Sequence, residues 1–219
     1  MTIVNACIGS DRAMLLADSG QFERTPPHRL TGTRSKILAL PEWRMLSAGC
    51  GSSVVTSQWR QWLACGGVGS NLADIATHGP TLLRELWGAS ANPCTVIFVV
   101  ALGDDGRPSA VAMGSGDGFQ PYRIPRGHVL LLPPTAELPA ERSEDSAEPA
   151  DAPPVETRAQ AEPAVTTPAD DDRPDWLYLR RKLIHGTRLQ LEQRRVQFAA
   201  PFTLATLHPE GIDLRRFEP

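Results

Sequence analysis

The order in which strand and helix patterns follow one another constrains this fold more than any other feature. Short apolar segments separated by turn residues fill the first 50 positions, two helical patterns occupy about 52–87, and strand patterns return from 95 to 132. Alternating βαβ units would instead place one helix between each pair of strands. The grouped order therefore favours an α+β protein in which helices and sheets form separate layers.

Turn residues set the limits of the expected strands. A polar, proline-containing stretch at 21–32 predicts a loop or an irregular hairpin tip, and Gly49-Cys50-Gly51 predicts a tight turn. Asp104-Asp105-Gly106 predicts a hairpin turn. Between such signals, strand patterns occupy 2–7, 13–17, 35–40, 44–48, 95–102, 110–113, 122–124, 129–132, 203–207 and 212–214.

Three segments carry helical patterns. The first runs from the capping serines at 52 and 53 to about residue 64, and the second runs from 72 to about 87 after the capping residue Asn71. Pro80 lies inside the second pattern, and we expect it to kink or split that helix. The third begins near 175, where Trp176 and the leucines after it recur at helical spacing.

The segment 137–174 differs from the rest of the chain. It is rich in Ala, Pro, Glu and Asp, and it has almost no aromatic or branched aliphatic residues. Such a segment cannot bury enough apolar surface to offset the entropy of ordering it. We therefore expect residues 1–219 to form a single domain with 137–174 as a disordered acidic insertion.

Composition excludes several functional classes. The formal net charge of −3 argues against a nucleic-acid-binding surface, and no apolar run approaches the length of a membrane span. The N-terminus has no signal-peptide pattern, so we expect a cytoplasmic protein without a membrane partner. No motif indicates a cofactor or a metal site. We expect four reduced, mostly buried thiols, because no Cys-x-x-Cys pair occurs among Cys7, Cys50, Cys65 and Cys94.

One position near the N-terminus carries recognisable chemistry. Thr2 is small enough that Met1 should be removed, which would leave a residue with both a hydroxyl and a free α-amine. That amine has an ordinary pKa of about 8, so a useful fraction is neutral near pH 7. A neutral amine can accept the hydroxyl proton and so activate the oxygen as a nucleophile. Thr2 alone is weak support, because many unrelated chains have threonine there.

The residues after Thr2 strengthen this hypothesis. The opening hairpin, with Asp18 sixteen positions after Thr2, resembles that of proteasome β-type subunits, and Arg34-Ser35-Lys36-Ile37 resembles the setting of the family's lysine. Ala48-Gly49 is similar to the family's oxyanion-hole segment before the first helix, and 202–212 resembles its final hairpin. Within the family, the β-proteobacterial proteasome homologue is the first candidate type. The two-ring bacterial protease and the Anbu-type relative are the alternatives.

The resemblance implies a fold and a set of roles. The fold would be the four-layer αββα sandwich of N-terminal nucleophile hydrolases. Thr2 would be the nucleophile, Asp18 would pair with Lys36 and keep it charged, and the Gly49 N–H would stabilise the oxyanion. Each residue also has a structural alternative: a turn cap for Asp18, a solvated edge charge for Lys36, and a turn with positive φ for Gly49.

The chain also departs from the family pattern. Gly114-Ser115-Gly116 looks like the family's supporting serine motif, but it arrives one strand too early and is better interpreted as part of a hairpin turn. In register, that serine would fall at 132–135, where none stands. The family's later acidic residue and serine would fall at 194–199, where Arg194 and Gln197 do not match.

The resemblance further implies a substrate and an assembly. Gln21, Arg34, Ser47 and Gly51 would line the first specificity pocket, where Arg34, unless it is merely a surface charge, would favour an acidic or polar side chain. Substrates would be peptides or unfolded proteins, the subunits would form homo-oligomeric stacked rings, and an ATP-dependent unfoldase would be a further partner. Three alternatives stay open: a catalytically silent ring subunit, a small-amide hydrolase with the same chemistry, and an unrelated α+β binding module.

Overall fold

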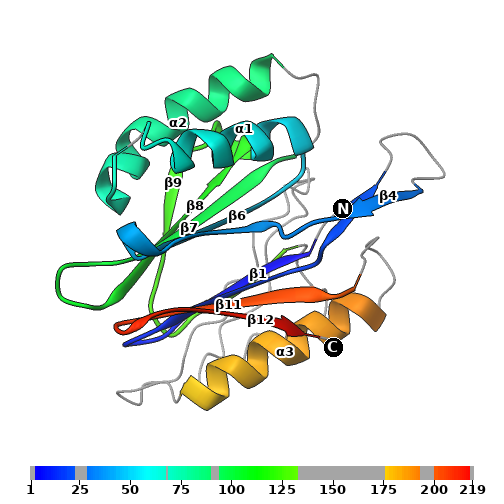
Figure 1. The fold of residues 1–219 in the computed structure, drawn as a ribbon, viewed down its shortest axis with the longest axis vertical. Coiled ribbons are helices and arrows are strands. Elements are labelled where there is room, and N and C mark those ends of the chain that lie inside the picture. The colour runs from blue at the N-terminus through cyan, green and yellow to red at the C-terminus, as the bar shows by residue number, and fades with distance from the viewer. Residues whose placement is uncertain are drawn as a thin grey trace, which may run out of the picture.

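The computed structural model describes residues 3–22, 29–67, 69–89, 94–132, 176–192 and 200–217. Thr2 and the expected insertion at 137–174 lie outside these ranges. Within them the fold is mixed α/β, with two five-stranded antiparallel sheets that face each other (Figure 1). Two helices cover the outer face of one sheet and a third helix covers part of the other.

The first sheet brings the two ends of the chain together. Its order is β10-β1-β2-β11-β12, with β1 Val4–Ile8, β2 Ala13–Ala17, β10 Val129–Leu132, β11 Phe202–His208 and β12 Gly211–Phe217. β1 and β2 are buried at every position, because one face packs on the other sheet and the other lies under the third helix. The chain therefore enters the core within a few residues of its start.

The second sheet is a meander of consecutive strands. Its order is β5-β6-β7-β8-β9, with β5 Ile37–Leu40, β6 Met45–Cys50, β7 Val96–Leu102, β8 Pro108–Gly114 and β9 Pro121–Ile124. Short 3-10 turns, Pro41–Trp43 and Ser115–Asp117, join β5 to β6 and β8 to β9. A separate hairpin of β3 Gly20–Phe22 and β4 Leu30–Thr33 occupies the stretch that was expected to be a loop or hairpin tip.

The helices begin at the capping residues that the sequence indicates. α1 spans Ser53–Ala64, and the side chain of Ser52 accepts a hydrogen bond from the Val55 N–H. α2 spans Leu72–Gly88 and is capped by Asn71. The expectation that Pro80 splits this helix is wrong, because α2 is continuous and Pro80 is buried within it. α3 spans Trp176–Glu192. None of the described helices is long and apolar enough to cross a membrane.

Three apolar cores separate the layers. One lies between the sheets, a second lies between α1, α2 and the second sheet, and a third lies between the first sheet and α3. Trp59 belongs to the second core, and Trp62, Trp87 and Trp176 pack against cores while partly buried. Cys7 and Cys50 are buried, whereas Cys65 and Cys94 are exposed. All four cysteines are free thiols. The expectation of mostly buried thiols therefore holds for half of them.

A buried polar network attaches α3 to the first sheet. The Asn5 side chain donates to Thr187 Oγ1 at 2.9 Å and to Gln190 Oε1 at 2.7 Å, and its oxygen accepts from the Leu132 N–H at 3.0 Å. All three polar side chains are almost wholly buried. Because each finds partners, the network fixes the position of α3 over β1 and β10.

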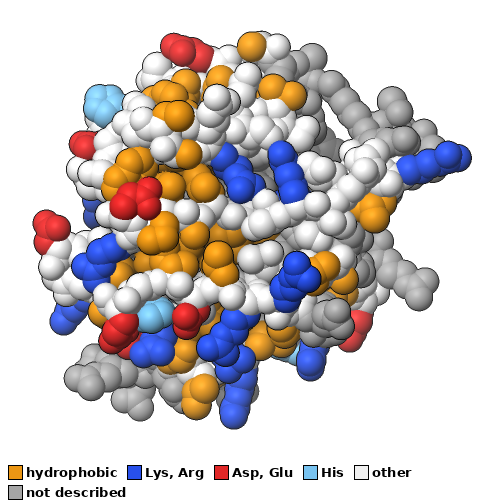
Figure 2. Space-filling model, in the orientation of Figure 1, with side chains coloured by type: hydrophobic (Ala, Val, Ile, Leu, Met, Phe, Trp, Pro, Cys, Tyr) orange, Lys and Arg blue, Asp and Glu red, His pale blue; other side chains and the backbone are white. Residues whose placement is uncertain are grey.

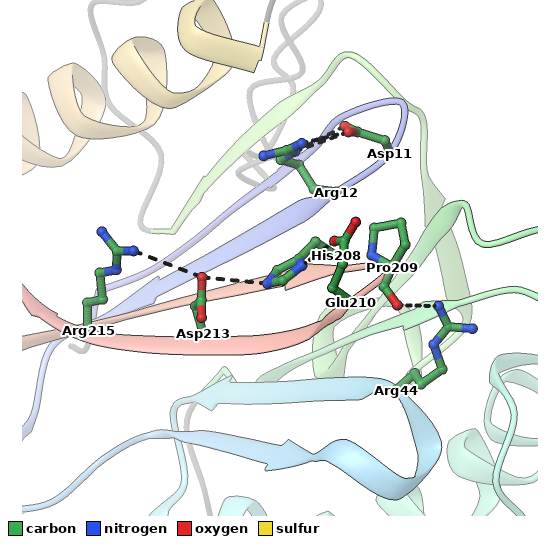
Figure 3. A network of polar contacts seen from close by, with 8 residues as sticks. All are labelled: Asp11, Arg12, Arg44, His208, Pro209, Glu210, Asp213 and Arg215. Atoms are coloured by element: carbon green, nitrogen blue, oxygen red, sulfur yellow. Dashed lines mark hydrogen bonds and ion pairs between the residues drawn. The ribbon is translucent and has the colours of Figure 1, made fainter.

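A charged cluster at the β11–β12 turn connects the two sheets (Figure 3). Arg44, which leads into β6, donates from Nη2 to the Pro209 carbonyl at 3.0 Å. Beside it, His208 Nδ1 lies 2.7 Å from Glu210 Oε2, and His208 Nε2 lies 3.5 Å from Asp213 Oδ2. This cluster lies at the opposite end of β5 from Lys36, so it stabilises the sheet-to-sheet packing far from the candidate site.

Candidate active site

A buried ion pair lies where β2 ends and β5 begins. Lys36 Nζ is 3.0 Å from Asp18 Oδ1 and 2.9 Å from Asp18 Oδ2. The Asp18 side chain is 0% exposed and that of Lys36 is 12% exposed. The pairing that the sequence predicted is therefore present, in a geometry that shares one ammonium between both carboxylate oxygens. The solvated-charge alternative for Lys36 does not fit this burial, whereas Asp18 both caps a turn, through the Gly20 N–H, and pairs with Lys36.

Backbone groups complete the surroundings of the Asp18 carboxylate. Oδ1 also accepts from the Ile3 N–H at 2.9 Å, and Oδ2 accepts from the Gly20 N–H at 3.0 Å. The Asp18 N–H donates in turn to the Ile3 carbonyl at 3.2 Å. Ile3 is therefore held at both its N–H and its C=O by one residue. Thr2 is joined to that Ile3 nitrogen by a single peptide bond, and its own atoms lie outside the described residues.

The electrostatics of Lys36 follow from its burial. Removal from water lowers the pKa of the Lys36 ammonium, and the Asp18 carboxylate opposes that shift by its charge and its hydrogen bonds. The nearby Arg34 guanidinium lowers the pKa further. The pKa of Lys36 is therefore below its ordinary value of 10.5, and the amine gives up its proton more readily than an exposed lysine.

Gly49 lies inside β6 and not in a turn. It pairs with Ile97 of β7, and a Cβ at this position would be 2.7 Å from Ile97 Cδ1 and 2.8 Å from Thr56 Cγ2. Close packing of β6 against α1 and β7 therefore requires glycine here. The expected tight turn is confined to Gly51, whose φ of 103° lies in the left-handed region. Burial raises the pKa of the intervening Cys50 to about 12, so this thiol stays protonated.

A shallow surface cavity of about 340 Å³, largely open to solvent, lies between α1 and the β3–β4 hairpin. Its described lining comprises Gln21, Arg34, Ser53, Val54, Ser57 and Gln58. Two of the four predicted specificity residues, Gln21 and Arg34, are brought together here. The Arg34 guanidinium donates to Ser57 Oγ at 2.8 Å, which connects the segment before β5 to α1. Figure 2 shows Lys and Arg side chains beside α1 on this face.

The other two predicted specificity residues lie elsewhere. Ser47 is 0% exposed, donates to the Phe98 carbonyl at 3.0 Å and accepts from Trp59 Nε1 at 3.1 Å. Its hydroxyl therefore serves the core beneath α1. Gly51 is exposed, but it is packed against the backbone of residues 94 and 95 and is absent from the described cavity lining.

Several expected site positions have no described structure. Thr2, residues 133–135 and the stretch 194–199 lie outside the described ranges. Ser115, which was interpreted as part of a hairpin turn, lies in the short turn between β8 and β9, where its Oγ accepts from the Thr95 N–H at 2.9 Å. In the part of the chain that the structure describes, no group of three His, Cys, Asp or Glu side chains could hold a metal ion.

Sequence reasoning missed some of the groups around the ion pair. The Gly20 N–H contact had a visible signal in the sequence. In Asp-x-Gly turns the Asp carboxylate commonly accepts a hydrogen bond from the N–H of the residue two positions later.

Comparisons with known proteins support the fold. No family model matches the chain, and no curated protein matches it in sequence. Among solved structures 281 chains match, including "Anbu (Gly-1) mutant from Hyphomicrobium sp. strain MC1", with a TM-score of 0.62 and 11% identity over 99% of this chain and 88% of that one. The chain therefore shares the overall fold of that solved structure. At 11% identity this likeness shows the fold alone.

Proposed function

We propose that this chain is a proteasome-like threonine peptidase whose nucleophile is Thr2 after removal of Met1. The observation that carries the proposal is the buried Asp18–Lys36 pair, which also holds the N–H of Ile3. One carboxylate thus positions both Lys36, whose side chain is 12% exposed, and the first described residue of the chain. The fold likeness supports the same assignment. The four-layer αββα class and the ring assembly belong to this proposal.

The proposed reaction begins with proton transfer from the Thr2 hydroxyl to its own neutral α-amine. The Lys36 ammonium favours the alkoxide by its charge, and Asp18 keeps that ammonium in position. The alkoxide attacks the peptide carbonyl, and the Gly49 N–H stabilises the tetrahedral oxyanion. Such a donor typically contributes about 3 kcal/mol. Collapse passes the proton to the leaving amine, and water then hydrolyses the acyl ester with the α-amine again as base.

The lowered pKa of Lys36 bears on this chemistry. A lysine whose proton is held less tightly can share it more readily with a neighbouring oxygen, while the two short contacts to Asp18 keep the charged form available. The negative charge of a Thr2 alkoxide beside Lys36 would also offset part of the free-energy cost of burying the Lys36 ammonium. We therefore propose an electrostatic role for Lys36, with the α-amine as the general base.

A second candidate function is a catalytically silent ring subunit. The sequence favours it at two places, because no serine stands at 132–135 and because Arg194 and Gln197 occupy positions where the family has supporting groups. Those groups would steady the α-amine. A silent subunit would keep the fold and the assembly but would not form a covalent adduct at residue 2.

Covalent labelling tests the proposed function. The purified chain is treated with a β-lactone or an epoxyketone, and its intact mass is measured alongside those of the Thr2→Ala and Lys36→Met variants. We expect one adduct on the unmodified chain, none on Thr2→Ala, and at least ~100-fold slower labelling of Lys36→Met. Lys182→Met is the matched control and should label at the unmodified rate. Absence of any adduct would favour the silent subunit, and an adduct that survives Thr2→Ala would remove Thr2 as nucleophile.

A further inference from the structure

β12 is the outermost strand of the first sheet, and among the described residues no strand pairs with its outer edge (Figure 1). It spans seven residues, and those at 213–216 are exposed. An open edge of this kind offers a row of backbone groups to another strand unless a proline or a bulge interrupts it. β12 contains no proline, and its pairing with β11 is regular throughout. The strand is therefore available for pairing.

Hydrogen bonds elsewhere in the sheet determine which groups of β12 point outward. The Asp18 N–H donates to the Ile3 carbonyl, so even-numbered positions along β2 bond toward β1. Bonding direction alternates along an antiparallel strand, so odd-numbered residues of β2 bond to β11. Even-numbered residues of β11 then bond to odd-numbered residues of β12. The N–H and C=O groups of Ile212, Leu214 and Arg216 therefore lie on the outer edge.

The charges on β12 are complementary to those of a second β12 that runs in the opposite direction. In a two-fold pairing centred on Leu214, Asp213 of each copy lies opposite Arg215 of the other copy. These positions exchange no backbone bonds across the new edge, so their side chains come closest together. The neighbouring registers, centred on residue 213 or 215, would place two aspartates or two arginines opposite each other. Charge therefore selects the register centred on Leu214.

The two faces of β12 would gain different contacts in this pairing. Ile212 packs at the margin of the core between the sheets, and Leu214 lies on the same face. Leu214 is 56% exposed, and its counterpart in the second copy would cover it. On the other face, Asp213 Oδ2 is 3.5 Å from His208 Nε2 and 4.0 Å from Arg215 Nη2 (Figure 3). The arginine of the second copy would give this carboxylate a further cation.

We propose that two copies of this chain associate through β12, antiparallel about a two-fold axis at Leu214. The two five-stranded sheets would join into one continuous sheet. The helix α3 does not obstruct this contact, because it packs over β1 and β10 at the other side of the sheet. A closed two-fold contact also differs from the head-to-tail contact that builds a ring, so the two can coexist. The proposal does not depend on the chemistry of residue 2.

Disulfide cross-linking tests the register directly. Leu214→Cys is introduced into a chain in which the exposed thiols Cys65 and Cys94 are replaced by serine. Facing residues of a bonded antiparallel pair have Cα atoms about 5.5 Å apart, within reach of a disulfide. Glutathione disulfide supplies the oxidant and is itself reduced to two thiols. We expect a covalent dimer on non-reducing gels, formed at least ~10-fold faster than with Tyr122→Cys, the control on the exposed edge strand β9.

Charge reversal tests the proposed ion pairs in the same cross-linking assay. Asp213→Arg and Arg215→Asp each place like charges opposite one another, and each should slow cross-linking at Leu214→Cys by at least ~10-fold. The double variant Asp213→Arg/Arg215→Asp restores opposite charges, and its rate should return to within about 3-fold of the starting rate. Both positions are exposed, so these changes leave the core intact.

Each outcome supports or overturns the proposal. Sedimentation equilibrium of the unmodified chain should show association, and a strictly monomeric chain would overturn the proposal. So would equal cross-linking at Leu214→Cys and Tyr122→Cys, or a double variant that stays as slow as the single ones. An assembly built only through other surfaces, or an edge that accepts a strand of a different protein, would leave Leu214→Cys without a covalent dimer.

Discussion

At the scale of single residues, Asp18 decides how the start of this chain is held. It accepts four hydrogen bonds, two from Lys36 and one each from the N–H groups of Ile3 and Gly20. A buried carboxylate is costly unless its lone pairs are used and its charge is balanced. The same contacts that stabilise Asp18 therefore also fix the position of β1 next to residue 2.

Removing the charge of Lys36 should destabilise the fold. Lys36→Met leaves the Asp18 carboxylate buried without a cation, and we expect a loss of about 3 kcal/mol in the free energy of unfolding. The Lys36→Met/Asp18→Asn double variant should recover part of that loss, because it has no unbalanced charge. Urea unfolding measures both variants, with Lys182→Met as control. Equal free energies of unfolding for Lys36→Met and Lys182→Met would argue that the Asp18–Lys36 ion pair is exposed to water.

Gly49 should tolerate no side chain. Gly49→Ala would push a methyl group to within 2.7 Å of Ile97 and 2.8 Å of Thr56, and we expect a loss of about 1–3 kcal/mol. Gly116→Ala is a matched control, since no heavy atom lies within 4 Å of the added Cβ. Urea unfolding should find that control within about 0.5 kcal/mol of the unmodified chain. A small effect at Gly49 would mean that α1 can move away from β6.

The sequence predicted the contacts of some single residues and not of others. The pairing of Asp18 with Lys36 was expected because their settings resemble those of the proteasome β-type family, and the structure contains that pair. Ser47 could not be placed, because a serine next to a glycine-rich segment is equally compatible with a pocket and with a buried hydrogen bond. Only the arrangement of Trp59 and Phe98 around it decides between them.

At the scale of elements, α1 is attached to β6 by a polar contact inside an apolar core. Ser47→Ala would leave the Trp59 N–H and the Phe98 carbonyl short of a partner, and we expect a loss of about 1–3 kcal/mol in urea unfolding. Ser57→Ala is the comparison variant, and its free energy of unfolding should lie within about 0.5 kcal/mol of that of the unmodified chain, because the Ser57 hydroxyl makes only an exposed contact. A Ser47→Ala variant as stable as Ser57→Ala would contradict this role of the Ser47 hydroxyl.

Element limits were easier to predict than element partners. Ala13–Ala17 and Val129–Leu132 match the expected strands because turn residues bound them closely. The pairing of β10 with β1 could not be predicted, because β1 and β2 are buried on both faces and lose the alternation that would orient them. Of the two effects expected of Pro80, only the splitting is wrong, since α2 continues past it.

At the scale of the whole molecule, two buried thiols make stability depend on alkaline pH. Burial raises the pKa of Cys7 and of Cys50 from 9.0 to about 12, and each thiol lies in a different core. The folded state thus keeps protons that the unfolded chain releases above pH 9. The stabilisation is complete below pH 9 and declines as pH rises toward 12, by about 1.4 kcal/mol per pH unit for each thiol.

Lys36 changes the pH dependence of stability in the opposite direction. Its folded pKa is lowered, so the unfolded chain binds more protons below pH 10.5 and stability rises with pH through that window. The two thiols, Cys7 and Cys50, together lower stability with rising pH more than the one amine, Lys36, raises it. We therefore expect the free energy of unfolding to fall between pH 9 and 10.5. Urea unfolding in reducing buffer at several pH values tests this, and Cys7→Ala should reduce the slope. An unchanged slope in that variant would assign the alkaline loss to other groups.

The fold as a whole was predictable in class but not in detail. Grouped strand and helix patterns indicated separate layers, and the solved structure of Anbu has the same fold at 11% identity. What single residues could not reveal is which sheet each strand joins, because that depends on contacts between segments more than 100 positions apart, such as Asn5 with Gln190.

The mass of the N-terminal peptide from the native protein is the most direct measurement of the central claim, because the proposed chemistry requires a free amine on Thr2. We predict a peptide that begins at Thr2, lacks Met1 and carries an unmodified α-amine. A peptide that retains Met1, or a Thr2 whose amine is acetylated, would contradict the proposal that this residue is both nucleophile and base.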